Sequence, residues 1–85
     1  METVQLQYPF TFEGREVTEL TLRRPKMRDM KRANAVKDEM EKSIRMIADL
    51  AEVSPKLVEE LDAEDFAALG AKLGEFMGAS AELTP

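Results

Sequence analysis

The sequence predicts an α+β fold in which an N-terminal antiparallel β-hairpin packs on three to four short α-helices. Three features predict it: alternating apolar and polar residues near the N-terminus, a Glu13-Gly14 turn before a second alternating segment, and helical periodicity after Pro25. A chain of 85 residues has room for one hydrophobic core. We therefore expect a single domain, 1–85, with three parts in chain order: the hairpin at about 4–22, the helical part at about 25–78 and a frayed tail at 79–85.

The first strand is predicted by apolar residues at every even position: Val4, Leu6, Tyr8, Phe10 and Phe12. This is the period of a strand with one buried face. Pro9 has no N–H group to donate, so the strand is expected at an edge.

The second strand, 17–22, raises a question of register. A two-residue turn would place Leu20 and Leu22 on the face opposite the aromatic side chains. We therefore expect a three-residue turn or a bulge near Val17, which sets Leu20 against Tyr8 and Leu22 against Leu6.

A short first helix is predicted after Pro25, which suits the first turn because its missing N–H would be unpaired there. Apolar residues then follow at spacings of three: Met27, Met30 and Ala33. The weakly patterned stretch 34–37 indicates a break. One long bent helix over 25–52 is the alternative.

A second helix is predicted by the amphipathic pattern of Met40, Ile44, Ile47, Ala48 and Ala51. Ser54 and Pro55 then form an N-cap and first-turn pair that opens another helical turn.

The last helix is expected to begin with Asp62 as its cap. Glu64 and Asp65 lie in its first turn, where their negative charge is favourable beside the positive end of the helix dipole. Its apolar stripe is Phe66, Leu69, Leu73, Phe76 and Met77. Gly78 is expected to end it.

The composition removes the usual parts of most catalytic and metal sites. The chain has no cysteine and no histidine, which excludes disulfides and thiolate or imidazole ligands. Asp62, Glu64 and Asp65 lack the ligand spacing of a calcium loop, and nothing places two carboxylates in an apolar cleft. We expect no enzyme activity, no metal and no cofactor.

Charge is distributed unevenly along the chain, whose formal net charge is -5. Residues 23–45 carry nine basic against four acidic residues, whereas residues 46–85 carry nine acidic against two basic ones. The basic segment makes a small nucleic-acid-binding regulator an alternative. The acidic total and the aromatic residues on predicted core faces argue against specific nucleic-acid binding. Without a long apolar run or a signal peptide, we expect no membrane contact and a cytoplasmic location.

Two groups of residues are candidates for partner binding. Arg23 and Arg24, with Met27 and Met30, combine charge and apolar side chains beyond what folding needs, although methionine also fills cores.

The second group is a glycine edge on the last helix. Gly70 and Gly74 recur at a spacing of four along the apolar stripe, and each interior glycine costs about 1 kcal/mol relative to alanine. Close approach by another helix, from this chain or a partner, would explain them. A short and weak terminal helix is the alternative.

The segments Leu6-Gln7-Tyr8-Pro9 and Val17-Thr18-Glu19-Leu20-Thr21-Leu22-Arg23-Arg24-Pro25 resemble the small tail assembly chaperones of contractile-tailed and Mu-like bacteriophages and prophages. The similarity continues through Val53-Ser54-Pro55, Leu61-Asp62, Asp65-Phe66 and Phe76.

This resemblance implies a protein without enzyme activity that binds the long tape-measure protein in the host cytoplasm. It implies that the tape-measure protein stays soluble until tail-tube subunits replace the chaperone. It also implies contact with the tail-tube protein and with a longer, frameshifted form of the chain itself. Homo-oligomerisation is left open, and a structural tail component retained in the virion is a further alternative.

Overall fold

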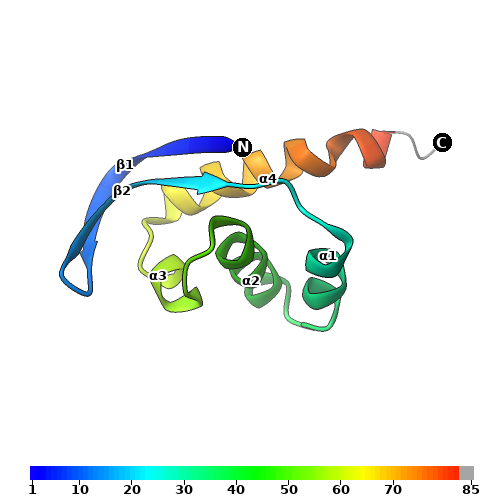
Figure 1. Cartoon of the computed structure of the whole chain (residues 1–85), viewed down its shortest axis with the longest axis horizontal. Helices are drawn as coiled ribbons and strands as arrows, with labels where there is room; N and C mark the ends of the chain where they lie inside the picture. The colour runs from blue at the N-terminus through cyan, green and yellow to red at the C-terminus, as the bar shows by residue number, and fades with distance from the viewer. Residues whose placement is uncertain (83–85) are drawn as a thin grey trace.

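The computed structural model describes the backbone of residues 1–82 and the side chains of residues 1–76. Over these residues the chain forms a hairpin followed by four helices (Figure 1). In chain order the elements are β1 (Glu2–Phe12), β2 (Arg15–Leu22), α1 (Met27–Asn34), α2 (Glu39–Ala51), α3 (Pro55–Glu59) and α4 (Ala63–Glu82). The predicted α+β class is confirmed.

Helix α2 lies at the centre of the arrangement. It contacts β2, α1, α3 and α4, while α4 also packs along β1 (Figure 1). The core is formed by apolar side chains from the hairpin and all four described helices: Val4, Leu20, Leu22, Ala33, Met46, Ile47, Ala48, Leu50, Val58 and Leu69. Helix α2 packs on β2 and α4 packs on β1, while α1 and α3 pack on α2, so these short helices bury their apolar side chains in one shared core.

The hairpin turn has two residues, Glu13 and Gly14, both with positive φ (51° and 81°). This is the backbone of a primed turn, whose twist matches that of the two strands. Phe12 therefore pairs with Arg15, and Phe10 with Val17. The expected three-residue turn is wrong, whereas the alternative expectation of a bulge near Val17 agrees with a register shift that begins next to the Phe10–Val17 pair.

The register changes further along the hairpin, within β1. Leu20 pairs with Val4, and Leu22 pairs with Glu2, so the expected partners Tyr8 and Leu6 are wrong as well. Between the two paired parts, residues 6–9 of β1 form a bulge. The bulge returns the two leucines of β2 to the buried face, which was the physical reason for expecting an irregularity.

The buried carboxylate of Asp65, at the start of α4, stabilises this bulge. Its Oδ1 accepts a hydrogen bond from the Gln7 N–H at 2.9 Å, and its Oδ2 accepts one from the Tyr8 N–H at 3.0 Å. Pro9, in the same segment, has no N–H that needs a partner. Asp65 lies in the first turn of α4 as predicted, but its side chain binds the hairpin.

The predicted break after the first helix is confirmed, since residues 35–38 separate α1 from α2 and no single bent helix spans them. Pro25 is not in the first turn, because α1 begins at Met27 with Lys26 as its N-cap. The Asp29 carboxylate accepts the Lys26 N–H at 2.8 Å and so satisfies the start of this helix.

The predicted caps of the last two helices are confirmed. Ser54 Oγ accepts the Leu57 N–H at the start of α3, and Asp62 accepts the Glu64 N–H at the start of α4. Helix α4 does not end at Gly78 but continues to Glu82. Of the expected frayed tail, residues 79–82 are helical and residues 83–85 lie outside the described part.

Candidate partner-binding surfaces

Arg23 connects three elements and is mainly structural. Its guanidinium donates two hydrogen bonds to the Asp29 carboxylate in α1, at 2.8 and 3.0 Å, and one to the Asp49 carbonyl oxygen in α2, at 3.3 Å. Its backbone N–H donates to the Leu50 carbonyl oxygen at 3.1 Å. The expectation that the charge of Arg23 exceeds what folding needs is therefore wrong.

The electrostatics of this pair follow from its geometry. The hydrogen bonds from Arg23, helped by the Lys26 N–H, lower the pKa of Asp29 from 3.8 to about 2, although burial acts in the opposite direction. The same carboxylate raises the pKa of Arg23. Glu52 Oε2 lies 3.5 Å from Arg23 Nε and adds a second, more exposed carboxylate.

The neighbouring candidates differ in exposure. Arg24 is exposed, and its guanidinium carbon lies 5.8 Å from the centre of the Phe76 ring on α4, within cation–π range. Met27 is 80% exposed, whereas Met30 is half-buried against the core. Arg24 and Met27 are thus the members of this predicted group that a partner can reach.

The glycine edge is open. A Cβ atom placed on Gly70 or Gly74 would meet nothing within 4 Å. The expected close approach by another helix of this chain is therefore wrong for the described residues. Contact of this edge with a partner stays a prediction.

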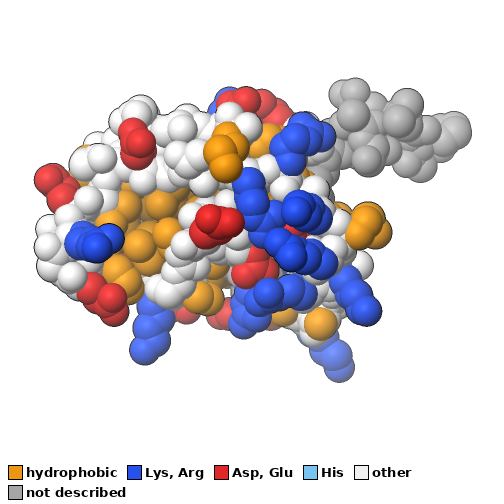
Figure 2. Space-filling view, viewed as in Figure 1, with side chains coloured by type: hydrophobic (Ala, Val, Ile, Leu, Met, Phe, Trp, Pro, Cys, Tyr) orange, Lys and Arg blue, Asp and Glu red, His pale blue; other side chains and the backbone are white. Residues whose placement is uncertain are grey.

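Basic side chains form a cluster near Arg24 and α1. Figure 2 shows them clustered over the β2–α1 junction and α1, on the same side of the molecule as a hollow lined by apolar side chains near the hairpin turn. The basic cluster corresponds to the segment whose charge the sequence had singled out.

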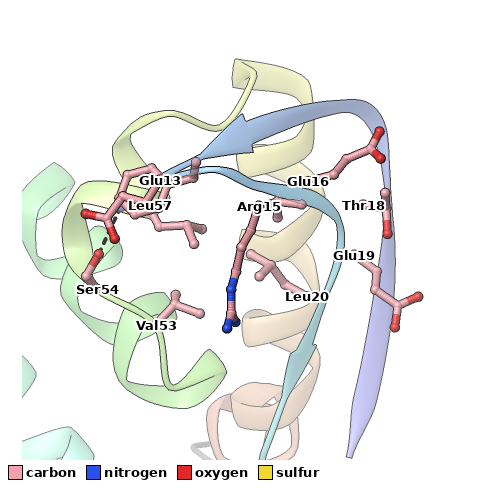
Figure 3. Close-up of a pocket in the computed structure, with 11 residues that line it drawn as sticks. Glu13, Arg15, Glu16, Thr18, Glu19, Leu20, Val53, Ser54 and Leu57 are labelled. Atoms are coloured by element: carbon pink, nitrogen blue, oxygen red, sulfur yellow. Dashed lines mark hydrogen bonds between the residues drawn. The ribbon is translucent and has the colours of Figure 1, made fainter.

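The hollow is a groove that the sequence analysis missed. It has a volume of about 720 Å³ and lies between β2 and the chain that joins α2 to α3. Its lining combines apolar and polar residues. The apolar ones are Phe12, Val17, Leu20, Val53 and Leu57, and the polar ones are Glu13, Arg15, Glu16, Thr18, Glu19 and Ser54. The side chain of Arg15 points into this groove, whereas the side chains of Glu16, Thr18 and Glu19 extend away from it at its β2 edge (Figure 3).

Arg15 is the only base in the first 22 residues, and this was the available sequence signal. It forms no salt bridge with any residue of the described part of the chain. The groove was missed because Val53, in the α2–α3 connection, and Leu57, in α3, come back to β2 from more than 30 residues away.

Within the described residues, no group of three or more acidic side chains is placed to hold a metal ion. No helix in that same part of the chain has the length and apolar character needed to cross a membrane.

These observations define a small α+β domain with an open apolar groove beside a basic face. The family model described as "Phage tail assembly chaperone proteins, E, or 41 or 14" matches residues 3–78. The chain belongs to this family of phage tail assembly chaperones, and the family predicted from its sequence is confirmed. No curated protein and no solved structure gives a significant match.

Proposed function

We propose that this chaperone binds helical segments of the phage tape-measure protein in the host cytoplasm and keeps it soluble until the tail tube polymerises around it. The observation that supports the proposal is the open apolar groove on a domain of this family. Long amphipathic helices associate through their apolar faces, and a groove that covers such a face prevents this association. The proposed role is binding without catalysis, and it ends when tail-tube subunits displace the chaperone.

The test is co-expression of the tape-measure protein of the same phage or prophage with the tagged chain. We expect a larger soluble fraction of tape-measure protein than with an empty vector, and co-purification of the two proteins. An unchanged soluble fraction without co-purification would contradict the proposal. A longer frameshifted form of the chain would be seen in the same preparation by mass spectrometry.

The basic face over α1 favours nucleic-acid binding as a second candidate function (Figure 2). The purified complex also distinguishes chaperone function from nucleic-acid binding. Bound nucleic acid would raise the absorbance of the complex at 260 nm and would be released at high salt. We expect neither effect. Detection of the chain in washed, mature virions would instead support a structural tail component.

A further inference from the structure

We propose that the groove between β2 and the α2–α3 connection is the docking site for an amphipathic helix of the tape-measure protein that carries a carboxylate opposite Arg15. This inference rests on the proposed function and names the surface and the chemistry that perform it. The apolar walls of this groove are formed by Phe12, Val17, Leu20, Val53 and Leu57, and Arg15 points into it.

The size of the groove suits several apolar side chains. A cavity of about 150 Å³ holds one benzene molecule, so the groove, at about 720 Å³, has room for four to five groups of that size. Phe12, Val17, Val53 and Leu57 are only half-buried in the free chain. A partner that covers them gains apolar burial without any rearrangement of the core.

The short length of the groove favours a helix over an added strand. The stretch of β2 that lines it, 15–20, spans about 17 Å at roughly 3.4 Å per residue. A strand directs only every second side chain at one face, so about three would fit along this length. A helix directs four, at i, i+3, i+4 and i+7, within about 10.5 Å.

Arg15 is the one basic residue among those that line the groove, and its side chain enters the groove, whereas the side chains of Glu16 and Glu19 extend away from it (Figure 3). Arg15 is exposed and forms no ion pair within the described part of the chain. Figure 3 shows it between the apolar walls formed by Leu20 and Val53. A carboxylate beside the apolar stripe of the incoming helix would form an ion pair with Arg15. Water is partly excluded there, which strengthens the attraction between the two charges.

The test uses the complex of full-length tape-measure protein with the chaperone, measured first with the wild-type chain. Arg15→Glu reverses the charge in the groove, and Val53→Asp places a charge on its apolar wall. The matched control is Glu60→Arg, a charge reversal of equal size at an exposed residue that does not line the groove. We expect both groove variants to weaken binding about tenfold or more and the control to bind within about twofold of wild type.

Thermal melts keep this test interpretable. Arg15→Glu changes an exposed side chain and should melt like the wild-type chain. If wild type binds and Arg15→Glu, still folded, binds equally well, the groove assignment is wrong while the proposed function stands. If the wild-type chain does not bind the tape-measure protein, the proposed function itself fails.

The helical form of the occupant is tested with peptides of about 25 residues that tile the tape-measure protein. For the tightest-binding peptide we expect a gain in helical circular dichroism on mixing, and amide shifts of the labelled chaperone centred on 15–20 and 53–57. A gain in strand signal would overturn the helical occupant, and shifts centred on α1 would overturn the site. Loss of self-association in Arg15→Glu, measured by sedimentation, would assign the groove to a second copy instead.

Discussion

Single residues in this chain have roles that their sequence neighbours do not reveal. Arg23 and Arg24 are adjacent and identical in sequence, yet one joins β2 to α1 and α2 while the other is exposed beside Phe76. The difference depends on Asp29 and on the end of α2, 26 residues from Arg23. Sequence alone identified the arginine pair as notable. It could not assign the two roles, because they depend on how the three elements meet.

The Arg23–Asp29 pair makes stability depend on pH. The folded-state pKa of Asp29 is lowered to about 2 from 3.8, so its contribution is fully present above about pH 4 and is lost as the pH falls toward 2. We expect Asp29→Asn to lower the free energy of unfolding by about 1 to 3 kcal/mol at pH 7. The variant should also lose less stability than wild type between pH 4 and pH 2.

Urea unfolding followed by circular dichroism at pH 7, 4, 3 and 2 measures both effects. Glu60→Gln is the control, because Glu60 is exposed and forms no salt bridge within the described residues. If Asp29→Asn and wild type lose the same free energy of unfolding between pH 4 and pH 2, the Arg23–Asp29 pair is not the source of the pH dependence.

At the scale of the elements, local pattern predicted most of what is observed. Alternation identified both strands, the unpatterned stretch 34–37 identified the break between α1 and α2, and Ser54 and Asp62 identified two helix starts. The hairpin register was not predicted correctly. The bulge that sets it is stabilised by a carboxylate from another element, and no local rule contains that information.

The glycine edge of α4 yields a prediction at this scale. Because a Cβ on Gly74 would meet nothing within 4 Å, we expect Gly74→Ala to stabilise the chain by about 1 kcal/mol through helix propensity. Gly70→Ala should behave in the same way. Gly14→Ala is the contrasting control, since its φ of +81° strains any L side chain and should make this variant less stable.

Thermal melts give the sign of each change, and binding to the tape-measure protein decides what the edge does. If Gly74→Ala melts higher and binds normally, the edge faces water in the complex as well. Weakened binding in a stabilised variant would show that a partner approaches the helix at this edge.

At the scale of the whole molecule, the fold is closed by contacts between its beginning and its end. Asp65 at the start of α4 accepts two backbone N–H groups of β1, and Lys72 lies 3.5 Å from Glu2. Helix α2 contacts both β2 and α4 and supplies the largest share of the buried core residues. The class and the element order followed from the sequence, but the groove did not, because its two walls come from distant segments.

Asp65 provides the prediction at this scale. Asp65→Ala leaves the N–H groups of Gln7 and Tyr8 without their acceptor, and we expect a loss of about 1 to 3 kcal/mol in the free energy of unfolding. Hydrogen exchange at these two amides should accelerate beyond the change in global stability. Glu64→Gln, an exposed change in the same turn, should stay within about 0.5 kcal/mol of wild type. Unchanged exchange at Gln7 and Tyr8 in Asp65→Ala would contradict this account of the bulge.

The bond from Tyr8 to Asp65 also has a consequence during translation. The two residues are 57 positions apart, so at about 5 to 20 residues per second a ribosome needs roughly 3 to 11 s to synthesise the segment between them. For that time the nascent hairpin has its turn but not the carboxylate that fixes its bulge. Its strands are then free to sample the straight two-residue register, in which Leu20 and Leu22 face outward. Until α4 has been synthesised, the nascent chain therefore lacks the acceptor that holds the bulge of β1, and with it the register that buries Leu20 and Leu22.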